Sequence, residues 1–180
     1  ATDHCYPVPE TVSARAAGFM PNMESACNFV MDTMPVVGER LLVIGQGVVG
    51  LLTTAVLSSF PLASLVAADR LPARREWARR LGATEAVAAV RPPVALPCES
   101  TGDADGDDAG AFDAVVELSG NPEAIDEALA VTGFSGRIVI GSWYGRKRAS
   151  VNLGGAFHRK RIRIISSQVS TVAPELLGRW

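Results

Sequence analysis

The stretch LLVIGQGVVG, residues 41–50, decides the fold of this chain. Its first four residues form a continuous apolar run bounded by turn residues, which is typical of a strand buried on both faces. Glycines follow at 45, 47 and 50, and an amphipathic segment over 48–59 continues from them. The stretch therefore predicts a buried strand that turns sharply into a helix.

Short apolar runs alternate with helical patterns along most of the remaining chain. Strands are predicted over 41–44, 64–68, 85–90, 112–118, 137–140 and 161–166, and helices over 23–34, 48–59, 72–81 and 122–131. Strands separated by helical patterns indicate βαβ units and a parallel sheet. We predict an α/β protein with a doubly wound Rossmann fold, in which a six-stranded parallel sheet carries helices on both faces.

Three regions follow from this pattern. Residues 1–34 are interpreted as a connector and a helix, with Pro21 and Asn22 as a break or cap before that helix. Residues 35–170 are predicted to form the nucleotide-binding domain, and residues 171–180 a C-terminal tail. The acidic segment over 101–110, rich in Asp and Gly, is predicted to be a surface loop of undetermined role.

The glycines match the pattern G-x-G-x-x-G, in which each glycine has its own mechanical role. Gly45 permits the tight turn, Gly47 lets the backbone approach a pyrophosphate, and Gly50 lets the helix pack closely on the strand. The N–H groups at the helix start and the helix dipole favour the negative charge of the diphosphate. We assign to a cofactor site Gly45, Gln46, Gly47, Val48, Val49 and Gly50.

Asp69, nineteen residues after Gly50, stands at the end of the second predicted strand. A carboxylate there accepts hydrogen bonds from the adenosine ribose and repels the 2′-phosphate of NADP, which favours NAD. Arg70 and Arg74 keep NADP possible, because an arginine at such a position can pair with a 2′-phosphate. We predict NAD as the cofactor and assign Asp69, Arg70 and Arg74 to its site.

Four phrases then occur in an order typical of one family. They are ERLLVIGQGVVG over 39–50, ADR over 68–70 with Arg74 and ARRLGA over 78–83, FDAVVELSG over 112–120, and GRIVIG over 136–141. From about residue 19 to residue 167 the chain resembles the cofactor domain of the medium-chain dehydrogenase/reductases, the superfamily of zinc alcohol, sorbitol and threonine dehydrogenases. The resemblance implies that Ser119, Gly120, Gly141 and Ser142 lie near the nicotinamide half of the cofactor.

The resemblance also implies hydride transfer between the cofactor and an alcohol or carbonyl substrate, bound through a catalytic zinc domain that would precede this chain. Zinc is expected for the family, but its ligands are not found here. A last ligand would fall near residues 20–21, which cannot bind zinc, and Glu24 is the only nearby candidate. The spacing of His4, Cys5, Cys27 and His158 is not that of a metal site. We name no catalytic residue and expect this chain alone to be inactive.

Other interpretations remain open. A stand-alone module could bind NAD(H) without turnover, and a methyltransferase could use a related fold. The resemblance implies a homodimer formed through the last strand, 161–166, although the same chain could equally cap that edge.

Composition excludes several classes of partner. The 180 residues are 48% hydrophobic and carry a net charge of −2, which argues against nucleic acid and membrane partners. The basic clusters over 146–148 and 158–163 are interpreted as a solvated rim near the carboxyl edge of the sheet. Three widely spaced cysteines without a CxxC motif fit a reducing, cytoplasmic location.

Overall fold

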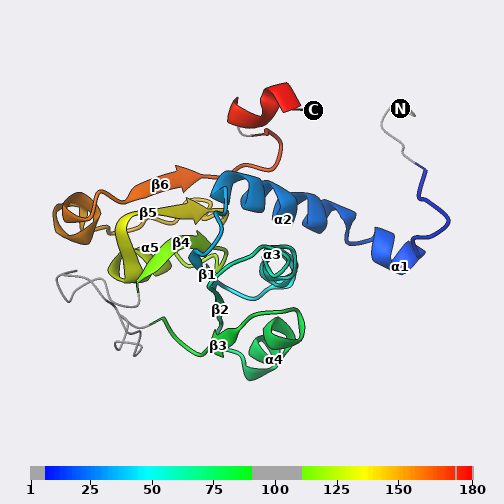
Figure 1. The fold of residues 1–180 in the computed structure, drawn as a ribbon, viewed down its shortest axis with the longest axis horizontal. Coiled ribbons are helices and arrows are strands. Elements are labelled where there is room, and N and C mark those ends of the chain that lie inside the picture. Colours follow the sequence, from blue (N-terminus) through cyan, green and yellow to red (C-terminus); the bar gives the residue numbers. More distant parts are fainter. Residues whose placement is uncertain (1–6, 91–110, 173, 180) are drawn as a thin grey trace.

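A computed structural model describes residues 7–90, 111–172 and 174–179 of the chain (Figure 1). Its elements are α1 Ala14–Ala17, α2 Met20–Thr33, β1 Arg40–Ile44, α3 Val48–Leu57, β2 Ser64–Ala68, α4 Pro72–Arg80, β3 Glu85–Val87, β4 Phe112–Glu117, α5 Ala124–Val131, β5 Thr132–Ile140, the π-helix η1 Leu153–Phe157, β6 Arg163–Ser166 and the 3₁₀ helix η2 Pro174–Arg179. The acidic segment 101–110 lies outside the described residues. Among the described helices, none combines the length and apolar character that crossing a membrane requires.

The six strands form one sheet in the order β3-β2-β1-β4-β5-β6, and every pair is parallel. This is the strand order of doubly wound dinucleotide-binding domains, so the predicted fold is confirmed. The order reverses between β1 and β4, which lie side by side although the chain passes through β2 and β3 between them. In open parallel sheets, the crevice at the carboxyl ends of the strands beside such a reversal is where ligands bind.

Helices cover both faces of the sheet, with α2, α3 and α4 on one face and α5 on the other (Figure 1). Side chains alternate along β1, because successive residues of a strand point to opposite faces. Leu41 and Val43 pack in the same core cluster as Phe29 of α2. Leu42 and Ile44 pack in a second cluster with residues of α5. A central strand that is apolar at every position is therefore required, as the run over 41–44 indicated.

Several predicted boundaries are wrong. Helix α2 begins at Met20, and Pro21 lies in its first turn, where the missing N–H of proline breaks no helical hydrogen bond. Strand β5 begins at Thr132, immediately after α5. The prediction started it at residue 137 because two glycines interrupt the strand pattern in its first half. Strand β3 ends at Val87, three residues before the prediction. The remaining differences, at the ends of α2, α3, α4, α5, β1, β4 and β6, amount to one or two residues.

The two basic clusters lie at opposite edges of the sheet. Residues 146–148 follow β5 and lie beyond its carboxyl end, as predicted. Residues 158–162 precede β6, whose parallel direction places them at the amino edge. The interpretation of both clusters as one rim is therefore wrong, because the direction of β6 separates them.

Candidate nucleotide-binding site

A cavity of about 570 Å³ opens at the carboxyl edge of the sheet, where β1, β2 and β4 end. Six of the residues that the sequence assigned to a cofactor site line it: Gly45, Gly47, Asp69, Arg70, Arg74 and Ser119. They come from three separate regions: the β1–α3 turn, the β2–α4 connection with the first turn of α4, and the β4–α5 turn. The cavity thus lies at the reversal point of the strand order, which is the position that this fold offers to ligands.

The three motif glycines are needed for different reasons. Gly45 has a φ of +90°, and a Cβ there would lie 2.6 Å from the Cα of Ser119. A Cβ on Gly50 would lie 1.9 Å from the carbonyl oxygen of Gly45, so the first turn of α3 rests directly on the preceding turn. Around Gly47 no atom lies within 4 Å of such a Cβ. No packing contact therefore requires a glycine at position 47, and the missing side chain leaves open space on the cavity wall.

The amino end of α3 has the features of an anion site. Its N-cap is Gly47, which has no side chain to accept hydrogen bonds from the first turn. The N–H groups of that turn also lack partners within the helix, since the first turn of any α-helix has none. They carry the positive end of the helix dipole. A diphosphate fits these residues, because its oxygens would accept from unpaired N–H groups where backbone can approach closely.

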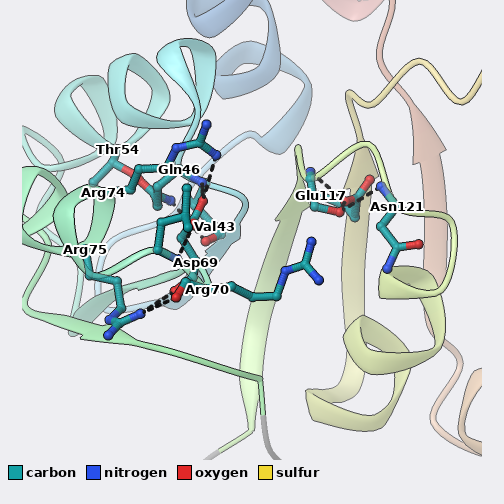
Figure 2. Close-up of polar contacts among 11 residues, drawn as sticks. Val43, Gln46, Thr54, Asp69, Arg70, Arg74, Arg75, Glu117 and Asn121 are labelled. Atoms are coloured by element: carbon teal, nitrogen blue, oxygen red, sulfur yellow. Dashed lines mark hydrogen bonds and ion pairs between the residues drawn. The ribbon is translucent and has the colours of Figure 1, made fainter.

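Asp69 lies beside this turn, directly after β2 (Figure 2). Its Oδ2 accepts a 2.8 Å hydrogen bond from the N–H of Gln46, and its Oδ1 accepts one of 2.8 Å from the N–H of Leu71. Arg74 approaches Oδ2 to 3.4 Å, and only 8% of the Asp69 side chain is exposed. The carboxylate is therefore held against the glycine turn and lines the cavity, rather than pointing into solvent.

Two neighbours of this carboxylate behave differently. The side chain of Gln46 is fully buried and turns away from the cavity, donating to the carbonyl of Val43 and accepting from the hydroxyl of Thr54. Its backbone N–H donates to Asp69, and Gln46 does not line the cavity, so its predicted contact with the cofactor is not formed by this structure. Arg70 extends from the end of β2 across the cavity toward the segment of Asn121 (Figure 2). Its guanidinium is the charged group that reaches furthest between the two walls in this view.

The opposite wall is built by the β4–α5 turn. Ser119 lines the cavity, whereas Gly120, Gly141 and Ser142 do not. The N–H of Gly120 donates to the Ser142 hydroxyl at 2.9 Å. Gly141 lacks a side chain for a packing reason, since a Cβ there would meet the ring of Phe29 at 2.6 Å. The predicted contact of these three residues with the cofactor is therefore not formed at the cavity surface, and the bond from Gly120 to Ser142 joins the turn after β4 to the segment after β5.

Behind that wall lies a residue that the sequence analysis did not single out. Glu117, the last residue of β4, is completely buried, and its carboxylate accepts hydrogen bonds from Ser119 and from the hydroxyl of Tyr144. Burial and the contact with Glu117 raise the pKa of Tyr144 above its usual range. A glutamate within the apolar run FDAVVE was the one signal that could have revealed it.

The cavity has further lining residues outside the predicted set: Ile44, Ala68, Leu71, Ala88, Ala89, Val90, Leu118, Asn121, Glu123, Ala124 and Glu127. Ile44 and Ala68 are the last residues of their strands, residues 88–90 and 118 directly follow a strand, and Ala124 and Glu127 belong to α5. Residues 88–90 were missed because the prediction placed them inside β3. A strand that ends three residues earlier leaves them free to form the cavity wall.

Among the residues that the structure describes, no three His, Cys, Asp or Glu side chains gather as a metal site. Cys27 is a free, exposed thiol on α2. His4 and Cys5 lie outside the described residues. The described residues do not fit a zinc ion, and we assign no zinc ligand to them.

Sequence comparison identifies the family. The sequence profile of the family described as zinc-binding dehydrogenase matches residues 48–177. L-threonine 3-dehydrogenase of Chromobacterium violaceum is 26% identical over 137 residues, which are 76% of this chain and 38% of that enzyme. The probable D-xylulose reductase A of Aspergillus fumigatus is 33% identical over 82 residues, 46% of this chain and 23% of that protein. The chain belongs to the zinc-binding dehydrogenase family, as a cofactor-binding domain of the medium-chain dehydrogenase/reductase superfamily.

Solved structures share the fold. A zinc-binding dehydrogenase from Sinorhizobium meliloti, solved with NADP, aligns with a TM-score of 0.72 at 20% identity and covers 90% of this chain and 46% of its own. An alcohol dehydrogenase from Escherichia coli, solved with NADH, aligns with a TM-score of 0.73 at 21% identity and covers 97% of this chain and 50% of its own. The chain therefore spans half or less of the length of these relatives.

Proposed function

We propose that this chain is the NAD(H)-binding domain of an alcohol- or polyol-type dehydrogenase. The observation that carries the proposal is the position of Asp69, whose carboxylate is hydrogen-bonded to the glycine turn and lines the same cavity as Gly47. A diphosphate at the start of α3 would bring the adenosine ribose next to this carboxylate. The family membership of the chain supports the same assignment.

The two halves of the sheet would then hold the two halves of the cofactor. The β1–β3 half takes the adenosine, and the β4–β6 half, with Ser119 on its wall, takes the nicotinamide. Bound NAD(H) supplies the acceptor or donor of a hydride. This chain binds and orients the cofactor, whereas substrate contacts and catalytic groups belong to a second domain. We accordingly expect the 180-residue chain to bind NADH without oxidising alcohols.

Charge at the ribose position favours NAD over NADP. A 2′-phosphate would enter next to the Asp69 carboxylate, which repels it. Arg74 already pairs with that carboxylate, at 3.4 Å, and so is less available to a phosphate. Arg70 has no ion-pair partner among the described residues and is the group that could still accept NADP.

Titration of NADH and NADPH into the wild type and Asp69→Ala tests the proposal. The wild type should bind NADH more tightly, and the substitution should weaken NADH by about tenfold, the worth of a hydrogen bond to a charged group. NADPH should lose less, because repulsion disappears with the carboxylate.

The ratio of the two affinities is the decisive quantity. Asp69 also holds the N–H of Gln46, so losing it can weaken both cofactors equally through the turn. Glu76→Ala, an exposed carboxylate on α4 away from the cavity, is the control and should leave both affinities unchanged. An unaltered NADH-to-NADPH ratio in Asp69→Ala removes Asp69 from the ribose site, and a wild type that binds neither cofactor refutes the proposed function.

A further inference from the structure

Glu117 is a buried carboxylate that pairs with no cationic side chain in the described part of the chain. It is completely inaccessible to solvent, and none of the ion pairs among the described residues includes it. Three donors face it instead: the Ser119 N–H at 2.7 Å, the Ser119 hydroxyl and the Tyr144 hydroxyl. Taking a carboxylate out of water costs free energy that an apolar residue would avoid. Glu117 joins two loops, because Ser119 lies in the turn after β4 and Tyr144 in the segment after β5.

Further hydrogen bonds join the same two loops. The N–H groups of Gly141 and Ser142 both donate to the backbone carbonyl of Glu117, at 3.1 and 3.2 Å. The Ser142 hydroxyl accepts from the N–H of Gly120, and Nζ of Lys147 donates to the Gly120 carbonyl at 3.0 Å. The segment after β5 thus holds the turn after β4 at both polar backbone groups of Gly120. Glu117 is the side chain at the centre of this connection.

The turn that Glu117 holds is a wall of the cavity. Ser119 lines the cavity, whereas Glu117 and Tyr144 do not. The Cα of Ser119 is also the atom closest to a Cβ built on Gly45, at 2.6 Å, so this turn packs directly on the glycine motif. Any shift of Ser119 changes the width of the cavity on the side of β4.

We propose that Glu117 is a positioning residue, which acts through Ser119 and Tyr144 to fix the cavity wall that receives the nicotinamide half of the cofactor. This inference rests on the proposed function, because it presupposes that a dinucleotide lies across the cavity. It adds that recognition of the nicotinamide half depends on a buried carboxylate that does not touch the cofactor. The adenosine half would be bound by the β1–α3 turn and Asp69, neither of which hydrogen-bonds to the Glu117 side chain.

The test compares NADH with ADP, which contains only the adenosine and diphosphate part. Binding of each to the full 180-residue chain is measured by calorimetry for the wild type, Tyr144→Phe and Glu117→Gln. Tyr144→Phe removes one hydroxyl and keeps the ring, so it tests the inference even if Glu117→Gln does not fold. We expect each variant to bind NADH about tenfold more weakly and ADP within about twofold of the wild type. Glu76→Gln is the matched glutamate control and should change neither affinity.

The outcomes separate this inference from the proposed function. A wild type that binds neither NADH nor ADP refutes the proposed function itself. A wild type that binds both, with variants that lose NADH and ADP equally or lose neither, overturns the role of Glu117. A lower melting temperature with unchanged NADH affinity would assign Glu117 to stability alone and would also overturn the inference.

Discussion

Gly47 and Gly50 stand three residues apart in one turn, yet a methyl group added to each meets very different surroundings. On Gly50 it would lie 1.9 Å from the carbonyl oxygen of Gly45, and on Gly47 it would meet no atom within 4 Å. The backbone of Gly47, with φ of −70°, is also accessible to alanine. One glycine therefore serves the packing of α3 on β1, and the other keeps the cavity wall open.

A matched pair of alanine substitutions separates these roles. Gly50→Ala forces α3 away from the turn, and we expect it to lower the free energy of unfolding by about 3 kcal/mol, as overpacking does. Gly47→Ala should leave that free energy nearly unchanged and weaken NADH binding, because its methyl group would stand where the diphosphate approaches. Urea unfolding and NADH titration measure the two effects. Equal stability of both variants would contradict the assignment.

At the scale of elements, a buried ion pair ties the end of α2 to the sheet. Arg137 of β5 makes two 2.7 Å hydrogen bonds to the Glu39 carboxylate. It also donates to the carbonyls of Thr33 and Met34, where α2 ends in a left-handed residue. Burial alone would raise the pKa of Glu39, but the hydrogen bonds from Arg137 and Val36 and the charge of Arg137 outweigh it and lower that pKa.

Arg137→Met should therefore cost stability in a pH-dependent way. At pH 7 we expect a loss of about 3 kcal/mol, because the variant leaves Glu39 and two carbonyls without their partner. A carboxyl group whose pKa is lowered by folding stabilises above its unfolded pKa of 4.5, and that contribution is lost as the pH falls through the folded value. The difference between wild type and variant should shrink below about pH 4.5.

Urea unfolding at pH 7 and at pH 3.5 measures this difference. The control is Arg80→Met, which removes an exposed pair with Glu76 on α4 and should cost less than about 1 kcal/mol. A pH-independent loss in Arg137→Met would mean that packing of the arginine stem, and not its pairing with Glu39, holds α2.

At the scale of the whole molecule, β6 is one of the two edge strands of the sheet, with β3 at the other edge, and it pairs only with β5 among the described strands. An edge strand presents unpaired backbone groups that a second strand can bind. Ile164 lies in it and is 36% exposed. We propose that two copies of the chain pair through this edge, as the resemblance to the family implies.

Light scattering over a range of concentrations tests the assembly. We expect the mass of a dimer for the wild type and a shift toward the monomer for Ile164→Asp, which places a charge in the proposed contact. Ile164→Val, which keeps the apolar surface, is the matched control. A wild type that stays monomeric at every concentration would contradict this pairing and would mean that β6 is not covered by a second copy.

The local sequence pattern alone was sufficient to predict the class of fold and the part of the cavity that the β1–α3 turn and Asp69 form. Each feature used for this prediction can be recognised from adjacent residues in the sequence. These features are the apolar run 41–44, the glycines after it, and Asp69 at the end of the next strand. The carboxyl ends of parallel strands meet at one edge, so predicting the strands also predicted where these residues gather. The placement of Gly45, Gly47 and Asp69 around one cavity follows from that rule.

Only the tertiary structure decided the contacts that join distant segments. Glu117 meets Tyr144 across 27 positions of sequence, and Arg137 meets Glu39 across 98. Such pairs depend on which strands are neighbours and on their register, because a shift of one residue turns a side chain to the other face of the sheet. The periodicity of the sequence predicts whether a side chain is buried. It does not predict which distant residue that side chain will contact, because this depends on how the strands are ordered in the sheet.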